Sequence, residues 1–443
     1  MEIIRGYIAV RSRLSRRTGM IHGEISPRIR KRIQAIFGKD LTPEQAVRQI
    51  MEDIHTNGDA ALRDYMLRID GIKLSSFEID SHTVKEAYNQ VAPELISALQ
   101  TAAERIREFH QAQKESVWNG ISGEDWRQLI RPLNRVGLYA PGGTAPYPST
   151  ILMITIPARV AGVKEIILAT PPGQDGLLPP VTLAAADIAG AHRVFRISGA
   201  QAIAAMAYGT DSIPKVDKIC GPGNIFVALA KRAVFGEVDI DAIQGPSEIL
   251  IIADDSASAE YCAADLLSQA EHDAQAQAIL LTTSEVFASR VIEELNMQIA
   301  TLPRKNIAAE SLGENGVIGV LDNLEEAIEL ANLYAPEHLE LAIQSAERYL
   351  DKITCAGCIF LGKNSAEAIG DYVAGPNHSL PTGGTARFSS PLNILDFMKI
   401  TNVVKISQPN LERLGKAAIT IARAEGFEAH ARAVEKRLQG KLH

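Results

Sequence analysis

Three side chains able to bind a metal or carry a proton share one predicted helix face. Asp265, Gln269 and His272 are spaced by four and three residues, and apolar residues recur around them at the three-residue steps of a helix. This face therefore carries a carboxylate, an amide and an imidazole. Two interpretations stay open: a solvated polar stripe, or half of a metal site with His272 as a nitrogen ligand. A metal site needs further ligands from elsewhere in the chain.

A second candidate is an adjacent acid and imidazole. Glu337 and His338 follow Pro336, which disfavours helix at the preceding residue, so a helix predicted over 324–333 must end here. At such a break, the side chains of two neighbouring residues are directed differently, so they could serve two proton-transfer tasks. An exposed surface pair is the simpler alternative.

Further candidates lie toward the C-terminus. Asp371 and His378 belong to a glycine-rich, non-periodic segment over residues 370–390, and long loops of this kind are often functional. Glu425 and His430 lie in the last 50 residues, which we expect to be helical.

Composition limits the classes of protein to consider. With 443 residues the chain is too long for one core, so two or more domains are expected. The formal charge of −8 and the absence of a long basic run argue against nucleic acid as the main partner. No apolar run is long enough to span a bilayer, and no signal peptide is recognisable, so we expect a cytoplasmic protein. The lone CxxC at Cys355 and Cys358 lacks the second pair of a zinc ribbon and is interpreted as buried strand packing.

From residue 136 onward, short apolar runs alternate with helical stretches. This alternation predicts a parallel sheet covered by helices. The predicted strands are 136–139, 165–169, 193–197, 216–219 and 249–252, and the predicted helices are 150–160, 180–188, 200–208 and 225–234. A second α/β unit follows, and a basic, helical segment over residues 1–40 precedes both. A separate helix is predicted to begin at Thr42 and to end at Asn57-Gly58.

Two turns rich in glycine and proline follow predicted strands. One begins at Pro141, and the other is Gly221-Pro222-Gly223-Asn224, which opens a helix. Either could place backbone N–H groups against a phosphate. Neither is a GxGxxG fingerprint, because Phe226 occupies the third glycine position after Gly221, and simple tight turns explain them equally well.

Taken together, six motifs in the same order resemble the histidinol dehydrogenase family over nearly the whole chain. They are Tyr139-Ala140-Pro141-Gly142-Gly143, Gly221-Pro222-Gly223-Asn224, Gly245-Pro246-Ser247-Glu248, Ser268-Gln269-Ala270-Glu271-His272-Asp273, Ala335-Pro336-Glu337-His338-Leu339, and the segment 370–390.

The resemblance implies a two-step oxidation of L-histidinol through L-histidinal to L-histidine, with NAD as the hydride acceptor and one Zn²⁺ per subunit. It implies that Gln269, His272 and Asp371 bind zinc together with His430 of the partner subunit, within a homodimer that shares its active sites. The resemblance also implies that His338 is the general base and that Glu337 activates water. It implies that further substrate contacts are made by Ser247, His378 and Glu425. The residues that it places at the NAD site are Tyr139, Gln201 and Asn224. The zinc ligands, Glu337 and His338 also count as substrate-binding positions.

We accordingly expect an α/β fold of two Rossmann-like parallel-sheet units with a helical N-terminal arm and a small helical tail. The expected parts are an arm (1–32), a catalytic and zinc domain (33–138 with 247–392), an NAD domain with an incomplete Rossmann fold (139–246), and a tail that reaches the partner subunit (393–443).

Three alternatives remain. The nearest is a sibling zinc and NAD dehydrogenase for another small polyol or a sulfonated alcohol, against which Glu425 and His430 argue. A zinc hydrolase would use the same acid and imidazole but would leave the parallel-sheet unit without a ligand. A non-catalytic, metal-bound dimer would leave Glu337 and His338 without a role.

Overall fold

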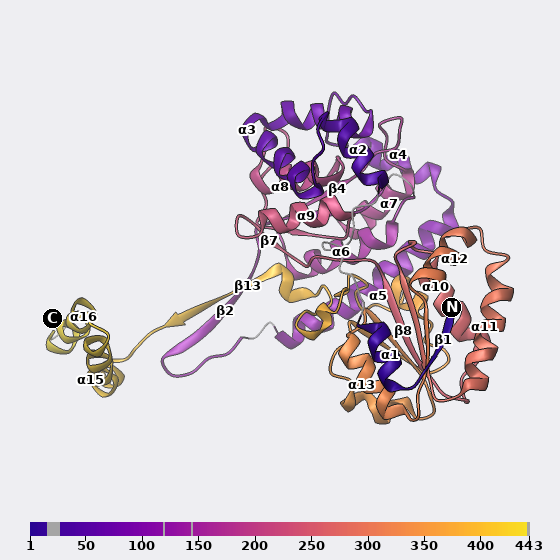
Figure 1. Ribbon diagram of the computed structural model, residues 1–443. Helices are drawn as coiled ribbons and strands as arrows, with labels where there is room; N and C mark the ends of the chain where they lie inside the picture. The colour runs from indigo at the N-terminus through magenta and orange to yellow at the C-terminus, as the bar shows by residue number, and fades with distance from the viewer. Residues whose placement is uncertain (16–26, 118–119, 143–144, 441–443) are drawn as a thin grey trace. The chain divides into compact units, whose positions relative to one another are not determined.

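The computed structural model describes residues 1–15, 27–117, 120–142 and 145–440 (Figure 1). The chain forms two compact units, one of residues 1–113 with 133–397 and one of residues 114–132 with 398–443. The first contains two parallel sheets, and the second contains an antiparallel ribbon and two helices. The predicted α/β fold with parallel sheets and a helical tail is therefore confirmed. The limits of the four predicted parts stay a prediction.

The first sheet has five parallel strands in the order β5-β4-β3-β6-β7. Its chain runs outward from β3 to β4 and β5 and then returns to β6 on the other side of β3, so the strand order reverses between β3 and β6. The strands are β3 (Arg135–Tyr139), β4 (Glu165–Thr170), β5 (Arg193–Arg196), β6 (Lys218–Cys220) and β7 (Asp239–Ile240). The helices are α6 (Pro148–Ala161), α7 (Pro180–Ala189), α8 (Gly199–Tyr208) and α9 (Ile225–Val234). Apart from β7, which is not predicted, these bounds match the predicted ones within two residues, and α9 matches at both ends.

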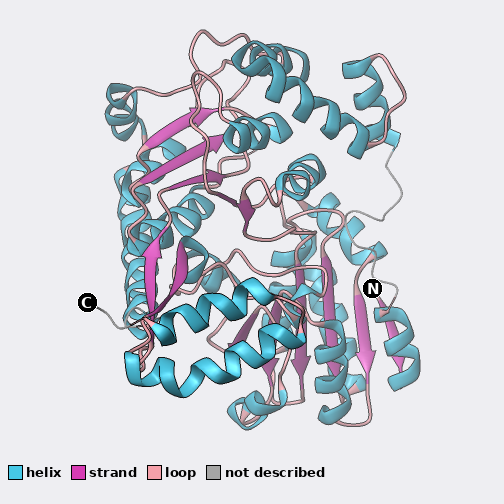
Figure 2. Ribbon diagram, turned by 90° about the vertical axis from the view of Figure 1, so that its left-hand side faces the viewer, coloured by secondary structure: helices cyan, strands magenta, loops and turns pink. Residues whose placement is uncertain are grey.

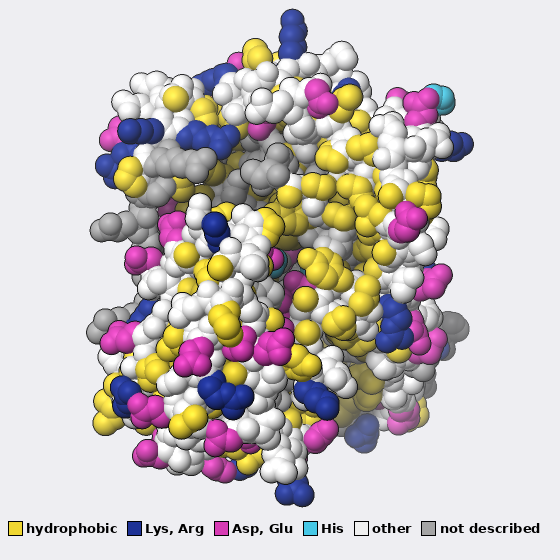
Figure 3. Space-filling view, turned by 90° about the vertical axis from the view of Figure 1, so that its right-hand side faces the viewer, with side chains coloured by type: hydrophobic (Ala, Val, Ile, Leu, Met, Phe, Trp, Pro, Cys, Tyr) yellow, Lys and Arg dark blue, Asp and Glu magenta, His cyan; other side chains and the backbone are white. Residues whose placement is uncertain are grey.

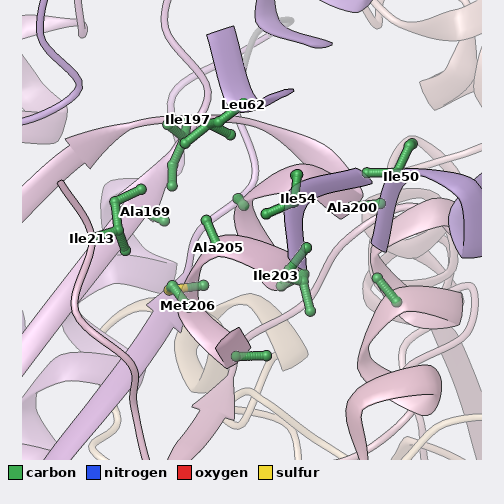
Figure 4. Packing of buried hydrophobic residues seen from close by; sticks show 14 of the residues in the cluster. Ile50, Ile54, Leu62, Ala169, Ile197, Ala200, Ile203, Ala205, Met206 and Ile213 are labelled. Carbon is green, nitrogen blue, oxygen red and sulfur yellow. The ribbon is translucent and has the colours of Figure 1, made fainter. Parts of the chain in front are cut away.

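One face of this sheet is covered by α8 and α9, and a long N-terminal helix, α3 (Pro43–Asp70), packs on these two helices (Figure 4). Ile54 of α3 lies toward Ile203 of α8, Ile50 lies beside Ala200, and all four side chains are buried. Alanines fill much of the rest of α8, so helix and sheet can approach closely. The apolar stripe of α3 is thus explained by packing on α8 and α9 rather than by a separate core.

The predicted break at Asn57-Gly58 is present in α3, but a second helical segment follows it directly. The start of α3 is as expected, since Thr42 and Gln45 form a reciprocal capping box. At Gly58 the backbone leaves helical geometry, with φ 52° and ψ −129°, and then resumes the helix as far as Asp70. The glycine therefore marks a kink within one element.

Gly58→Ala is expected to lower the free energy of unfolding by about 1–3 kcal/mol, because a side chain at this positive φ strains the backbone. Space is not the cause, since an added Cβ would meet only Thr210 at 4.0 Å. The matched control is Gly313→Ala, a helical glycine in open space, which should be neutral or stabilising. Urea unfolding of the three proteins checks this, and equal stability of Gly58→Ala and the native chain would contradict it.

The second sheet has six parallel strands in the order β1-β10-β9-β8-β11-β12. Helices cover both of its faces, α10, α11 and α12 on one and α1 and α13 on the other (Figure 2). The strands are β1 (Glu2–Arg5), β8 (Glu248–Ala253), β9 (Gln277–Thr282), β10 (Val317–Val320), β11 (His338–Ala342) and β12 (Cys358–Leu361). The helices are α1 (Tyr7–Leu14), α10 (Ala259–Ala270), α11 (Glu285–Ile299), α12 (Lys305–Glu314) and α13 (Leu324–Tyr334).

The N-terminus corrects the expectation of a wholly helical arm. Residues 2–5 form the edge strand β1, which pairs with β10 from Glu2↔Val317 to Arg5↔Val320. The helix α1 then packs back with Val10 fully buried. The expected helix α2 is present (Pro27–Phe37), and residues 16–26 of the expected arm lie outside the described residues. Backbone pairing with β10, which the basic composition conceals, anchors this segment.

The second unit also departs from an all-helical expectation. Strands β2 (Trp126–Pro132) and β13 (Met398–Val404) form an antiparallel ribbon. Helices α15 (Gln408–Ala424) and α16 (Glu428–Gln439) follow β13 in the chain and pack on each other (Figure 1). Local patterns do not predict the short strand β13, because its pairing partner is far away in sequence.

The described surface is mixed in character. Acidic, basic and apolar side chains are interspersed over the described residues of the face in Figure 3. Among the described helices, none is both long and apolar enough to cross a membrane. The negative charge of the chain is therefore spread rather than gathered on that face.

Candidate active site

The candidate site lies at the amino ends of β8 and β11. The chain reaches it through Ala335, whose φ of 52° is unusual for a residue with a side chain, and then through Pro336. His338 opens β11 opposite Ile249 of β8. The predicted break before the Glu-His pair is thus confirmed, and the strand fixes the direction in which His338 points.

Glu337 and His338 are both buried, with 6% and 3% of their surfaces exposed, so the alternative of a surface pair is wrong. Each is fixed by the backbone of Glu248. The amide of Glu248 donates to Oε2 of Glu337 at 2.9 Å, and Nδ1 of His338 lies 3.0 Å from its carbonyl oxygen. Since Nδ1 is held by a carbonyl, it carries the proton of a neutral ring, which leaves Nε2 as the acceptor.

A short helix, α14 (Glu367–Tyr372), brings two carboxylates to this imidazole. Nε2 of His338 lies 3.7 Å from Oε1 of Glu367 and 3.7 Å from Oδ1 of Asp371. The ligand atoms of all three residues lie within 4.8 Å of one another. Because Glu367 and Asp371 are four residues apart, they project from the same side of the helix.

The polar face predicted around Asp265 is inside the protein. Asp265 and Gln269 are 8% and 1% exposed, so the alternative of a solvated stripe is wrong for them. The helix α10 ends at Ala270, so His272 lies in the following turn and not on the helix itself. The hydroxyl of Ser268 donates to Glu367 at 3.0 Å and thereby ties the end of α10 to α14.

His378 completes the cluster. Its Nδ1 lies 2.9 Å from the carbonyl oxygen of Asp371. The preceding Asn377 is buried, and its side chain contacts the carbonyl of Met153 and Nε2 of His110. A cavity of about 340 Å³ is lined by His338, Asp371 and His378, with apolar walls from β12 and α14. A small polar molecule would fit against the imidazoles with its carbon frame on the apolar wall.

The carboxylates control the protonation of His338. Burial alone would lower its pKa, but Glu337, Asp371 and Glu367 outweigh burial and raise the pKa to about 10. Burial, with a smaller contribution from Glu248, raises the pKa of Glu337 to about 8. A cation bound among these carboxylates would cancel their effect on His338 and bring its pKa down toward the range of a working base.

The other histidines are suited to be neutral ligands. Desolvation lowers the pKa of the half-buried His378, and it also lowers the pKa of His272, although His272 is exposed in the turn after α10. The pKa of Asp371 is lowered because the surrounding histidines outweigh its burial. At neutral pH the cluster thus offers two neutral imidazoles and a carboxylate, which are the forms that bind metals.

Three buried atoms of this cluster lack a hydrogen-bond partner in the described part of the chain: Oε1 of Gln269, Nε2 of His338 and Oε1 of Glu367. A buried polar atom without a partner costs roughly 1–3 kcal/mol. All three can donate an electron pair, and two of them, Nε2 of His338 and Oε1 of Glu367, face each other at 3.7 Å. The donor set therefore fits a divalent cation.

Behind the cluster lies a buried acid pair. Glu340 shares a face of β11 with His338 and contacts Asp265 of α10. Burial raises the pKa of Asp265 to about 6, and burial together with Asp265 raises that of Glu340 to about 8. At neutral pH one proton is shared between the two groups.

Glu340→Gln is expected to remove a pH dependence of stability. Since both pKa values are raised by folding, the folded state holds more protons than the unfolded state between about pH 4 and pH 8, so the free energy of unfolding falls as pH rises through that window. The free energy of unfolding of the variant should change less with pH over this window. At pH 8 it should exceed that of the native protein by an amount on the order of 2 kcal/mol. Urea unfolding at several pH values checks this, with the exposed Glu347→Gln as control. Parallel curves for all three proteins would contradict it.

Sequence reasoning missed two acids of the site. Glu367 stands one helical turn before Asp371, and that spacing is a signal that could have found it. Glu340 alternates with Leu339 and Leu341 in a strand, so a charged residue faces the same way as His338. Neither pattern is specific without the knowledge that both segments are buried.

The three residues expected at the NAD site lie at the carboxyl edge of the five-stranded sheet. Tyr139 ends β3, and Asn224 caps α9 by accepting from the amides of Phe226 and Val227. The Tyr139 hydroxyl accepts from the amide of Gly199, and Gln201 donates to Ser198. Tyr139 and the glycine turn flank the point where strand order reverses, which is where ligands bind in open α/β sheets. Gly143 and Thr144 of the other turn lie outside the described residues.

The structure places the remaining candidates as follows. Ser247 immediately precedes β8 at the amino edge that carries His338, and its carbonyl accepts from the amide of Gln277. Glu425 caps the end of α15 and His430 lies in α16, both exposed and both in the second unit. They are therefore not among the residues that the first unit assembles.

These features define a class of protein, an α/β enzyme with a buried imidazole and carboxylate centre that fits a metal and a glycine turn at a topological switch point. Comparison with known proteins narrows the class. The profile of the family described as histidinol dehydrogenase matches residues 38–438. The chain is 55% identical to histidinol dehydrogenase of Dehalococcoides mccartyi (strain CBDB1) and 48% identical to that of Deinococcus radiodurans, in each case over 99% of this chain and all of the relative. The crystal structure of histidinol dehydrogenase from Elizabethkingia anophelis superposes with a TM-score of 0.88 at 40% identity, over 99% of this chain and 98% of that one.

The chain therefore belongs to the histidinol dehydrogenase family, whose members are NAD-dependent oxidoreductases of histidine biosynthesis. The resemblance to this family that is inferred from six motifs is confirmed over nearly the full length of the chain.

Proposed function

We propose that this protein oxidises L-histidinol to L-histidinal and then to L-histidine, with two molecules of NAD as hydride acceptors and one zinc ion per subunit. The observation that supports it best is the buried cluster in which His338 lies 3.7 Å from Glu367 and from Asp371, beside the unpaired Oε1 of Gln269. The proposed zinc ligands are Gln269, His272 and Asp371, with His430 of the partner subunit. A cytoplasmic location is part of the same proposal.

His338 has the geometry for the first proton transfer. Its Nδ1 is fixed on the carbonyl of Glu248, so Nε2 is the free acceptor that takes the proton of the substrate hydroxyl. Bound zinc supplies a positive charge that holds the amine and imidazole of the substrate and orients the alcohol carbon. NAD supplies the hydride acceptor, because no side chain performs this chemistry.

Glu337 is suited to the second oxidation. The aldehyde must first add water, and a carboxylate beside the site can take the proton of that water. Burial raises the pKa of Glu337 to about 8, so its carboxylate is a stronger base than one in solvent. His338 thus serves as the base for the alcohol, and Glu337 serves as the base for the water that adds to the aldehyde. The further substrate contacts that we propose are Ser247, His378 and Glu425.

The chain itself keeps the two functional regions close. The carboxylate of Asp241 accepts from the amide of Gly221 in the glycine turn at 2.8 Å. Ser247, at the catalytic edge, follows Asp241 by six positions, a length that spans at most roughly 20 Å. A dinucleotide bound by its phosphates in the turn after Gly221 and by Tyr139, Gln201 and Asn224 could therefore reach the cluster with its nicotinamide ring.

The test is the formation of reduced nicotinamide, followed by its absorbance, with the zinc-loaded protein, NAD and L-histidinol. We expect two NADH for each histidinol consumed and none without NAD. Faster turnover of another small polyol or of a sulfonated alcohol would support the sibling dehydrogenase instead. Zinc-dependent hydrolysis without NAD would support the hydrolase.

We further propose a homodimer in which each zinc site is completed by the partner. This proposal is supported by the apolar side chains that α15 and the turn before α16 expose, such as Ile421 and Phe427, which a partner subunit could cover. Mixing inactive His272→Ala with inactive His430→Ala should restore part of the activity after subunit exchange, because a mixed dimer then has one intact site. If mass measurements show exchange and activity stays at zero, His430 serves its own subunit.

A further inference from the structure

The glycine turn after β6 is held by an ion pair that none of the steps above uses. Nζ of Lys231 in α9 donates to the carbonyl of Gly221 at 2.9 Å, and the amide of Gly221 donates to Oδ2 of Asp241 at 2.8 Å. Lys231 and Asp241 also form an ion pair with each other. The N–H and the C=O of Gly221 are thus bound by Asp241 and Lys231, the two members of one ion pair.

The pair is almost completely buried, with 2% of the Lys231 side chain and 4% of the Asp241 side chain exposed. Burying two charges is expensive, and an apolar pair of similar size would usually stabilise a fold as well or better. A contribution to stability alone therefore does not explain the pair. The structural effect peculiar to these charges is that they fix the peptide groups on both sides of Gly221.

The conformation of Gly221 is one that needs such fixing. Its φ is 120°, and a Cβ at this position would lie 2.0 Å from the carbonyl oxygen of Tyr139. The turn therefore packs backbone against backbone at the end of β3. Asn224 already occupies the amides of Phe226 and Val227, the amide of Gly221 is bound to Asp241, and Pro222 has no N–H. A phosphate would therefore be bound by the amides of Gly223 and Asn224, whose direction depends on the peptide groups of Gly221.

We propose that Lys231 and Asp241 are positioning residues for the dinucleotide, which hold the turn at 221–224 in the shape that receives its phosphates. The inference rests on the proposed function only in that NAD is taken as the ligand of this turn. It predicts an effect on the affinity for NAD that is separate from the effect on substrate, metal or fold.

The same sheet offers a matched control. Lys218 is also buried, with 6% of its side chain exposed, and lies 3.0 Å from Asp239 and 3.0 Å from Asp396. It stands at the first residue of β6, whereas the turn follows the last. Lys218→Met therefore removes a buried lysine charge without touching Gly221, although its partners Asp239 and Asp396 are more exposed than Asp241, with 53% and 22% of their side chains exposed.

The experiment compares Lys231→Met with Lys218→Met in the full-length, zinc-loaded protein. NAD binding is measured by calorimetry, and KM for NAD, KM for histidinol, kcat, zinc content and melting temperature are measured in parallel. Both variants should melt earlier than the native protein. Only Lys231→Met should weaken NAD binding and raise KM for NAD, by about tenfold or more, while kcat at saturating NAD, KM for histidinol and zinc content change little.

Folded Lys231→Met with native affinity for NAD would overturn the inference, and so would an equal loss of affinity in Lys218→Met. If Lys231→Met is recovered unfolded because Asp241 is left unpaired, Lys231→Met with Asp241→Asn carries the same expectation, since it buries no charge and keeps an acceptor for the Gly221 amide. A native protein that binds NAD but does not oxidise histidinol would instead count against the proposed function.

Discussion

His272→Ala should yield a folded protein that binds almost no zinc and turns over about a thousandfold more slowly than the native enzyme. His272 is exposed in the turn after α10, and partial desolvation lowers its pKa, so its nitrogen is a neutral donor close to Asp371. Three remaining ligands hold a zinc ion far less well than four. The measurements are metal content of the purified protein and turnover of histidinol with added zinc.

The control for this variant is Asp273→Ala in the same turn. Asp273 is exposed, and its carboxylate accepts from the amide of Gln275 at 2.8 Å. Its removal should leave zinc content and turnover close to native values. Native zinc content in His272→Ala would show that the metal is held elsewhere, with Glu367, Asp371 and His338 as the alternative ligand set.

The second large effect is expected at the acid and imidazole pair. His338→Ala should slow both oxidations by roughly 10² to 10⁴, because the same imidazole serves both. Glu337→Gln should slow mainly the conversion of aldehyde to acid, since only that step needs an activated water. The side-chain amide that replaces the Glu337 carboxylate keeps an oxygen for the Glu248 N–H, so the local backbone should be preserved.

Each variant is assayed separately with the alcohol and with the aldehyde, and His82→Ala, an exposed histidine, serves as control. Equal losses of Glu337→Gln on the two substrates would show that the glutamate acts through His338 instead of on water. A native rate of alcohol oxidation in His338→Ala would exclude the histidine as the base.

Local patterns predict those parts of the fold that are set by local interactions. The helix α9 is predicted correctly at Ile225–Val234 because Asn224 caps its start and the apolar spacing continues through it. The strand β1 cannot be found in this way, because Glu2–Arg5 is a strand only through its pairing with β10, more than 300 residues away. Gly58 shows a third case, in which a local break is predicted correctly, but the second helical segment that follows it is held by packing against α8 and α9.

The residues of the candidate site also differ in how far the sequence predicts them. Gln269, His272, Asp371 and the Glu337-His338 pair can be identified through motifs. Their protonation states follow from the fold, since burial raises the pKa of Glu337 while neighbouring charges outweigh burial at His338 and Asp371. Glu367 and Glu340 carry no motif, and their role appears only when α14 and β11 are seen side by side around His338. A negative charge that looks ordinary in sequence becomes significant when the fold removes it from water.

The six-position connection from Asp241 to Ser247 also constrains how the enzyme can move. A tether of this length limits how far the glycine turn and the catalytic edge can separate at this point. In the proposed reaction, the two hydride transfers require spent cofactor to be exchanged for fresh while the aldehyde is still present. We therefore expect the cofactor to be released from its own turn while the reactive aldehyde stays in the cavity beside His338.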